Sequence, residues 1–578
     1  MKNESDVRDV TSDDYDVVVV GSGGGGGMAS YRLTQLGLKV CLVEQGPMQE
    51  PQDIPMFQRD SEAPLRAIGT PDKNWGYFDN GVCGTELDGQ PYTTAEGQKD
   101  PRGFSWYRAQ VLGGRTNHYA RHSPRIGPYD MIQGDLDGLS PNWPVSFEEM
   151  MPYYDATEAV VGISGENTGM YHHPGTPDGI LQPAIAPRAY ELLIMAAARN
   201  VGVPAFQRHN AILTRRLGHR APCFYASPCM RGCSIGAAFS SSTSLIPLAL
   251  ETGRLTIVTR AKVCTVETDD DGKATGVTFV DTQTGQDGAV RARAVVLAAS
   301  ACATAQILLT SGGGSASNGG LANSSGQVGR NLTDTPGLRV TGQFPALENR
   351  PRYDEFGANM DHIYMPWWGY EAQKAGKMDF PRGYHIEVGQ GMRDAPEMWS
   401  VDQYANVNGN DYGESIRDEM RRYWGSFVYL DGRGEMVAND RSFCELDPEV
   451  KNQWGYPVLR FSWEWGDTEI NQIKHMQETF STIIERAGGT VVRGLGPAEE
   501  EMSPGGGMVH EVGTTRMGTD PDTTVCNAYG QTWDVPNLYV MDGGVLPTNP
   551  HKNPTLHIMA LAYRNSENLA KRLGNGEI

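Results

Sequence analysis

Residues 17–26 read Val-Val-Val-Val-Gly-Ser-Gly-Gly-Gly-Gly, and this stretch decides the fold. Four consecutive β-branched residues predict a buried strand that runs straight into a glycine-rich loop. Gly21, Gly23 and Gly26 satisfy the spacing G-x-G-x-x-G, and a helix can begin at residue 28. We expect Gly21 to permit the tight turn, Gly23 to let the backbone approach a pyrophosphate, and Gly26 to let helix and strand pack closely.

A second strand follows at residues 39–43 and ends in Glu44. A carboxylate at this place can accept hydrogen bonds from an adenosine ribose, and the N-terminus of the intervening helix can hold the phosphates. Three spaced glycines alone would also fit an ordinary turn. The order of strand, loop, helix, strand and acid therefore carries the prediction of a dinucleotide-binding unit.

The composition excludes several classes of protein. The 578 residues are enough for a large core and about two or three domains. The net charge of −21 argues against binding to nucleic acid or to an anionic membrane surface. No apolar run approaches the ~18 residues of a membrane-spanning helix. Residues 1–6 are polar and acidic, unlike a secretory signal. Nine scattered cysteines do not indicate a disulfide framework.

The rest of the chain divides into segments that rejoin this unit and a block inserted between them. Residues 255–258, 261–266, 276–280, 294–298 and 537–542 are predicted strands of the first sheet, and residues 558–573 a closing helix. The block from 338 to 465 is strand-rich and aromatic, which suits a sugar ligand or a plain sheet core. An amphipathic helix is predicted over residues 467–487, with Asp467 as its N-cap.

Four further motifs resemble those of the glucose–methanol–choline (GMC) oxidoreductases. Residues 108–118 resemble the glycine-glycine flavin loop, 329–334 the G-R-N-L-x-D segment, and 510–518 the loop with the catalytic histidine. Residues 542–547, followed by Asn553-Pro554-Thr555-Leu556, resemble the C-terminal segment of the family that contacts the flavin. The matches occur in order from residue 16 to about 572, so the resemblance covers the whole chain.

The resemblance implies an α/β fold, α+β overall. A Rossmann-type FAD-binding domain would carry an inserted substrate domain built on a β-sheet flanked by helices. The expected ranges are 14–337 for the FAD-binding domain with a cysteine-rich loop at 221–236, 338–500 for the substrate domain, and 501–578 for the C-terminal part with the catalytic residues.

The resemblance also implies which residues bind FAD. They are Gly21, Gly23, Gly26, Glu44, Arg108, Gly113, Gly114, Thr116, Asn117, His118, Val263, Ala299, Asp542, Gly543, Asn553, Pro554 and Thr555. In the pyranose-oxidase-like branch, a histidine at the spacing of His118 carries the flavin covalently, whereas related dehydrogenases keep it with non-covalent flavin. We expect a role for His118 beside the isoalloxazine ring.

His510 and Asn553 are the predicted catalytic residues. Oxidation of an alcohol removes a hydroxyl proton and a carbon-bound hydride; FAD accepts the hydride and the protein supplies the base. His510 matches the catalytic histidine of the family, and a neutral histidine suits the base. Asn553 matches the second site residue, whose amide can hold the hydroxyl without titrating. The alternative for His510 is a structural hydrogen bond, and His551 is a further candidate for the site.

Cys223, Cys229 and Cys233 lie within one Pro/Gly-containing loop. Clustered thiolates suit an iron–sulfur centre, whereas three ligands are too few for a closed zinc site. Their C-x5-C-x3-C spacing resembles that of bacterial glucose and glucoside 3-dehydrogenase catalytic subunits. This implies a 3Fe–4S cluster, a cytochrome c acceptor, and a small subunit whose export signal takes the complex to the periplasm. The alternatives are structural cysteines and a cytoplasmic protein.

We therefore predict FAD-dependent oxidation of a sugar or glycoside hydroxyl to a ketone, at C3 of a pyranoside. One alternative is an oxygen-using oxidase of the pyranose or C-glycoside kind that makes hydrogen peroxide. A GMC-fold lyase with a structural FAD and a non-catalytic electron-transfer or binding subunit are more remote alternatives.

Overall fold

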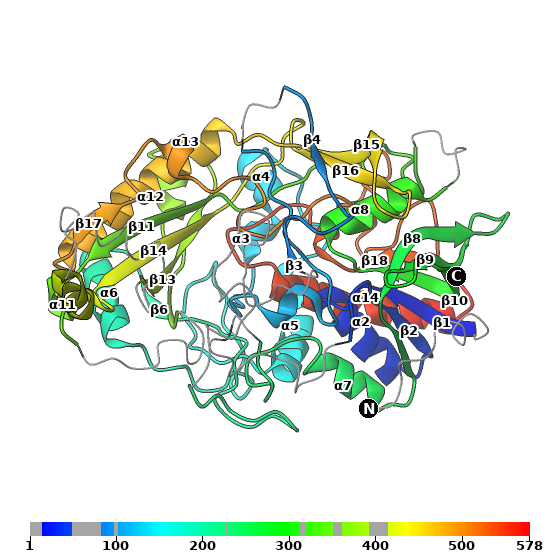
Figure 1. Cartoon of the computed structure of the whole chain (residues 1–578), viewed down its shortest axis with the longest axis horizontal. Coiled ribbons are helices and arrows are strands. Elements are labelled where there is room, and N and C mark those ends of the chain that lie inside the picture. The colour runs from blue at the N-terminus through cyan, green and yellow to red at the C-terminus, as the bar shows by residue number, and fades with distance from the viewer. Residues whose placement is uncertain are drawn as a thin grey trace.

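The structure is a computed structural model, and it describes residues 14–48, 83–97, 102–225, 229, 232–312, 319–350, 361–391 and 414–578. Figure 1 shows two halves, each built on a β-sheet, with segments from both ends of the chain in the half that contains the N-terminal strand. None of the helices in these residues is both long and apolar enough to cross a membrane.

The first sheet contains the strand of the opening motif. β1 (Asp14–Val20) pairs in parallel with β2 (Val40–Val43) on one side and with the second half of β10 (Asp287–Leu297) on the other. β7 (Leu255–Val258) extends it beyond β2, and β18 (Leu538–Val540) beyond β10, both in parallel. β8 (Ala261–Thr268) and β9 (Ala274–Asp281) form an antiparallel extension from the first half of β10.

Helices cover this sheet. α2 (Gly24–Gln35) packs against α14 (Thr555–Gly574) and α7 (Leu245–Leu250), and α5 (Phe147–Val161) packs against α14. α8 (Ala301–Thr310) follows β10 and packs against β8. α2 begins at Gly24 and not at residue 28, because residues 24–27 adopt the first helical turn. The predicted α/β class with a parallel, Rossmann-type sheet is confirmed.

The second sheet has the order β17-β11-β14-β13-β12-β6. Its strands are β17 (Thr490–Arg493), β11 (Gly337–Gln343), β14 (Phe427–Gly434), β13 (Tyr384–Gly391), β12 (Ile363–Met365) and β6 (Phe206–Gln207). α12 (Asp467–Arg486) packs against β11, β14 and α6 (Ala189–Asn200). The N-cap of α12 is Gly466 and not Asp467, because the Glu469 carboxylate reaches back to the Gly466 amide at 2.7 Å.

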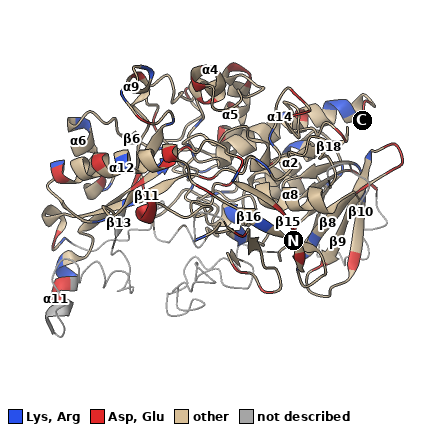
Figure 2. Ribbon diagram, turned by 90° about the horizontal axis from the view of Figure 1, so that it is seen from above, with Lys and Arg blue, Asp and Glu red and all other residues tan. Residues whose placement is uncertain are grey.

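Smaller sheets and short helices complete the described part of the fold. β15 (Phe443–Lys451), β16 (Pro457–Ser462) and β4 (Thr93–Thr94) form a third sheet, and β3 (Cys83–Gly84) pairs with β5 (Arg108–Ala109). The remaining short helices are α3 (Pro128–Met131), α4 (Gln133–Asp137), α9 (Tyr370–Lys374), α11 (Glu414–Tyr423), α13 (Ala498–Glu501), η4 (Gly114–Asn117), η6 (Pro345–Leu347) and η7 (Gly543–Val545). In Figure 2, acidic and basic positions are interspersed over both halves of the described chain.

Candidate active site

Gly21, Gly23 and Gly26, at the junction of β1 and α2, lie in three different environments. Gly21 has φ +92°, and a Cβ there would lie 2.5 Å from the Ala298 carbonyl oxygen. A Cβ on Gly26 would lie 1.8 Å from the carbonyl oxygen of Gly21. A Cβ on Gly23 would meet no atom within 4 Å. The loop therefore fits the expected tight turn, close packing and open approach to a phosphate.

Two further glycines of the run are needed for packing and were missed from the sequence. A Cβ on Gly25 would lie 1.8 Å from the carbonyl oxygen of Met541, and one on Gly27 would lie 1.9 Å from Ser241 Oγ. The uninterrupted run from Gly23 to Gly27 was the available signal. The run of glycines did not show that Met541 would approach Gly25 or that Ser241 would approach Gly27, because both residues lie far along the chain.

Glu44 directly follows β2 and is hydrogen-bonded to the glycine loop. Its Oε2 accepts hydrogen bonds from the Ser22 amide at 3.1 Å and the Ser22 hydroxyl at 2.5 Å, and its Oε1 accepts one from the Gly46 amide at 2.9 Å. Burial raises the pKa of this carboxyl. The Gly113 amide in turn donates to Ser22 Oγ at 2.8 Å, which connects the first loop to the predicted flavin loop.

The predicted flavin loop is folded by its own side chains. Gly113 has φ +91°, and η4 begins at the next residue. Thr116 Oγ1 donates to the Gly113 carbonyl at 2.5 Å, and Asn117 Nδ2 donates to the Leu112 carbonyl at 3.0 Å. The Nε2 atom of His118 lies 3.0 Å from the Tyr107 hydroxyl. Burial, with the nearby charges of Arg121 and Arg115, lowers the pKa of His118 to about 3.

One cavity of about 510 Å³ gathers most of the predicted site residues. Gly26, Gly113 and Asn117 stand behind its wall, where they shape the two loops. The predicted residues that line it are Gly21, Gly23, Glu44, Arg108, Gly114, Thr116, His118, Val263, Ala299, His510, Asp542, Gly543, Asn553, Pro554 and Thr555. A single space therefore runs from the dinucleotide loop to the predicted catalytic pair.

His510 is held on two sides. Its amide donates to Asp334 Oδ1 at 2.9 Å, and its Nδ1 lies 3.1 Å from the Thr335 hydroxyl, which leaves Nε2 for a ligand. Burial lowers the pKa of the imidazole to about 3, and the charge of Arg433 contributes in the same direction. The ring is therefore neutral at physiological pH and able to accept a proton.

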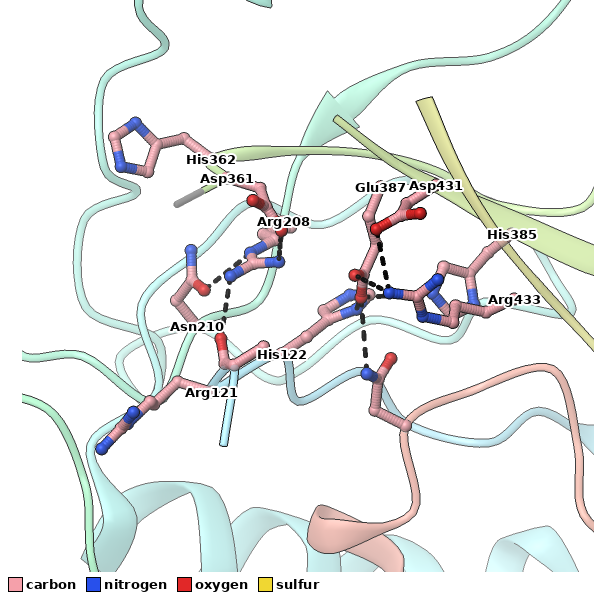
Figure 3. Close-up of polar contacts among 12 residues, drawn as sticks. Arg121, His122, Arg208, Asn210, Asp361, His362, His385, Glu387, Asp431 and Arg433 are labelled. Atoms are coloured by element: carbon pink, nitrogen blue, oxygen red, sulfur yellow. Dashed lines mark hydrogen bonds and ion pairs between the residues drawn. The ribbon is translucent and has the colours of Figure 1, made fainter. Parts of the chain in front are cut away.

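Asn553 points its amide nitrogen at Glu387, a residue of β13 for which no sequence motif gave a signal. Asn553 Nδ2 lies 3.4 Å from Glu387 Oε1, whereas Asn553 Oδ1 is buried with no hydrogen-bond partner among the described residues. Figure 3 shows the Glu387 carboxylate between the rings of His122 and His385 and the guanidinium of Arg433. Burial raises the pKa of Glu387, but Arg433 and the two histidines outweigh it and hold the pKa well below its usual value.

His551 lies outside the wall of this cavity. Its ring is buried, and its Nε2 lies 3.3 Å from Lys552 Nζ. Its backbone carbonyl oxygen lies 2.6 Å from His385 Nδ1. The alternative that His551 lines the site is not supported by this position.

The three cysteines lie together in a small hydrophobic cluster that is separate from the main core. Cys223, Cys229 and Cys233 pack in one apolar cluster with Ile185, Ile212, Ile235, Ala237 and Ala238. Two guanidinium groups flank it: Arg121 donates to the Cys229 carbonyl at 2.9 Å, and the charge of Arg220 interacts with Cys233. Residues 226–228 and 230–231 of this loop lie outside the described residues.

Known protein families match three stretches of the chain. Two models described as GMC oxidoreductase match residues 182–337 and 438–562, and one described as an FAD binding domain matches residues 16–51. Together these stretches contain the first glycine loop and both predicted catalytic residues.

Curated relatives align along almost the whole chain. A 2-methyl-1,2-propanediol dehydrogenase from Mycolicibacterium austroafricanum is 32% identical over 98% of this chain and 97% of its own. A paromamine 6'-oxidase from Streptomyces fradiae is 29% identical over 97% of this chain and 93% of its own. The solved structure of a formate oxidase from Aspergillus oryzae RIB40 superposes with a TM-score of 0.64 at 15% identity, over 97% of this chain and 98% of that chain, which shows a shared fold.

Proposed function

The chain belongs to the GMC oxidoreductase family, and we propose that it oxidises a hydroxyl group of a sugar or glycoside to a ketone, at C3 of a pyranoside. It is an FAD-dependent enzyme that acts on alcohol or sugar hydroxyls. The observation that carries the proposal is the single cavity that joins Gly23 at the dinucleotide loop to His510 and Asn553. The choice of C3 rests on the resemblance of the cysteine loop to glucoside 3-dehydrogenases.

The residues present fit FAD. The open face of Gly23 leaves room for a pyrophosphate, and the N-terminus of α2 directs its amides toward that space. Glu44 is fixed at the end of β2, where it can accept a ribose hydroxyl. Gly114, Thr116 and His118 would contact the flavin end. When bound, FAD supplies the acceptor for the hydride that leaves the substrate carbon.

His510 and Asn553 divide the work on the substrate hydroxyl. His510 Nε2 takes the hydroxyl proton, because Thr335 engages the other ring nitrogen. The Asn553 amide has a second N–H beyond the one directed at Glu387, and it holds the hydroxyl oxygen as negative charge develops there. Glu387 fixes the orientation of that amide.

The low pKa of His510 leads to a pH prediction. A histidine with a pKa near 3 stays neutral, and keeps a lone pair on one ring nitrogen, at every pH well above that value. We therefore expect the anaerobic rate of flavin reduction to show no loss from protonation of His510 between pH 8 and pH 5, measured by stopped-flow absorbance. A tenfold loss per pH unit below pH 6.5 that persists in Asp334→Asn would contradict this assignment.

Asp334 provides a control for that profile. Burial, and then the charge of Glu511, raises the pKa of Asp334 to about 7. A transition near pH 7 is assigned to this carboxyl if it disappears in Asp334→Asn, and to another group if it persists there.

For the electron acceptor, we propose a 3Fe–4S cluster held by Cys223, Cys229 and Cys233, serving a cytochrome c partner in the periplasm. The three thiols share one apolar cluster between two arginines, which suits an anionic cluster. The cluster would supply one-electron transfer to the haem. A small subunit with an export signal would carry the chain out of the cytoplasm.

An oxygen-using oxidase is the second candidate. It is favoured by the aligned relative named as a paromamine 6'-oxidase. In that case the three cysteines would be structural, and oxygen would be the electron acceptor, with hydrogen peroxide as its product.

The visible absorption spectrum, recorded without air before and after addition of methyl glucoside, tests both candidates. We expect flavin bands over a broad iron–sulfur absorption, bleaching of the flavin by the glycoside, and a 3-keto product. Cys229→Ser should lose the broad absorption and still bleach. If the spectrum shows flavin bands alone, and these bleach with the glycoside and recover in air with formation of peroxide, the protein is the oxidase and not the dehydrogenase. A flavin that no sugar or alcohol bleaches would contradict both candidates.

A further inference from the structure

His122, His385 and Glu387 form a buried cluster beside the proposed active site (Figure 3). Glu387 Oε1 lies 3.0 Å from His122 Nδ1 and 3.4 Å from His385 Nε2. One ligand atom from each residue lies within 4.8 Å of the other two. Glu387 also lines the cavity that contains His510 and Asn553.

The cluster is assembled from two distant segments of the chain. His385 and Glu387 are two residues apart on β13, so their side chains project from the same face of the strand. His122 comes from the loop that follows η4 and is held by a β-bridge to Asn210. Two imidazoles and a carboxylate therefore converge without belonging to one contiguous motif.

The hydrogen bond of His385 Nδ1 directs the lone pair of its other ring nitrogen, Nε2, toward the Glu387 carboxylate. Its Nδ1 lies 2.6 Å from the backbone carbonyl of His551, which can only accept, so Nδ1 carries the hydrogen. In the neutral ring, Nε2 then holds a lone pair that faces Glu387 Oε1, another acceptor. A positive species between these atoms resolves that conflict. A histidine whose second nitrogen donates to a backbone carbonyl is the usual arrangement around a metal ion.

The separations suit such an ion. Ligands about 2.0–2.2 Å from a metal lie about 3.0 Å apart along an octahedral edge and about 3.4 Å apart along a tetrahedral one. The two contacts of Glu387 Oε1, at 3.0 and 3.4 Å, lie within this range of separations. The nearest arginine, Arg433, lies 3.6 Å from the other carboxylate oxygen, Oε2. Oε1 faces the two rings and also the Asn553 amide nitrogen, at 3.4 Å.

We propose that His122, His385 and Glu387 bind a divalent transition-metal ion, zinc foremost, beside the catalytic cavity. Two imidazoles and one carboxylate are a ligand set of zinc sites that keep an open position. Because Glu387 is part of the cavity wall, that position would be accessible to an oxygen of the substrate. The ion would thus anchor the substrate next to Asn553, which goes beyond the proposed reaction.

A second buried cluster shows the contrast. Asp130, Glu435 and His551 also bring three ligand atoms within 4.8 Å of one another. There, Lys552 Nζ lies 2.7 Å from Asp130 Oδ2 and 3.3 Å from His551 Nε2, and Arg382 donates to Glu435 at 3.0 Å. A lysine and an arginine already balance the two carboxylates, so this cluster carries no proposal.

Metal binding by the FAD-loaded protein, stripped with a chelator and dialysed, tests the proposal without any turnover. Cobalt(II) is the probe, because its visible absorption reports the ligands, and zinc competes for the same site. We expect about one equivalent of cobalt to bind the wild type with nitrogen and oxygen ligands. His385→Asn and Glu387→Gln should each weaken binding by about 100-fold or more, since even outer partners of a site cost 10–100-fold.

The controls separate this site from the other metal-binding candidates. Cys223→Ser, Cys229→Ser and Cys233→Ser combined, and separately Asp130→Asn, should leave the cobalt spectrum and affinity unchanged. Absence of cobalt and zinc binding by the wild type at tens of micromolar would overturn the proposal even if the variants fold poorly. Binding that survives both His385→Asn and Glu387→Gln would also overturn it. Neither outcome bears on the oxidation itself.

Discussion

His510→Ala is expected to slow anaerobic reduction of the flavin by the sugar about 10²–10⁴-fold, the usual worth of a positioned general base. The loss arises because Nε2 accepts the hydroxyl proton, and the remaining site offers the Asn553 amide, which cannot take it. FAD content should be unchanged, since the contacts that position the two glycine loops involve other residues. The measurement is the stopped-flow rate of flavin bleaching at saturating substrate.

His475→Ala is the matched control for that prediction. This histidine is half-buried on α12, lies 2.9 Å from the Tyr384 hydroxyl and is not part of the cavity wall. Its variant should reduce the flavin at close to the wild-type rate. If His510→Ala reduces its flavin within threefold of the control, the base lies elsewhere, and the structural contacts of His510 with Asp334 and Thr335 are its whole role.

The dinucleotide half could be predicted from the sequence because its chemistry is local. The strand, the turn and the start of the helix lie within one continuous stretch, and each glycine has a backbone task that no other residue performs. Glu44 follows from the same reasoning, since it ends the next strand of the sheet. His510 and Asn553 could be identified because they sit in loops whose residues match a family motif.

The substrate side could not be predicted in the same way. Glu387 lies on a strand whose alternating pattern predicts only a sheet, and its partners His122 and Arg433 come from a distant loop and from the neighbouring strand β14. Their meeting depends on the register of β13 with β14 and on the β-bridge between His122 and Asn210. Such long-range pairing leaves no local signal in a single sequence, which also explains why Gly25 was not distinguished from its neighbours.

Gly26→Ala is expected to abolish FAD binding through the fold, with a loss of about 3 kcal/mol or more in the free energy of unfolding. The new Cβ would lie 1.8 Å from the Gly21 carbonyl oxygen and 2.9 Å from its carbonyl carbon, and both are backbone atoms of the phosphate loop. They cannot rotate away as a side chain could. Moving the loop would also disturb Gly21, whose own surroundings include the Ala298 carbonyl.

Gly24→Ala in the same helical turn is the control, because its Cβ would meet its nearest side-chain atoms, on Met559 and Thr555, at 3.5 Å, an ordinary contact. Purified Gly26→Ala should hold less than about a tenth of the wild-type flavin, read from the ratio of flavin to protein absorbance, and should unfold at lower temperature. Gly24→Ala should keep the wild-type unfolding temperature. Equal flavin content and stability in the wild type and Gly26→Ala would mean that helix and strand are not in this close contact, and the role assigned to the third glycine would be wrong.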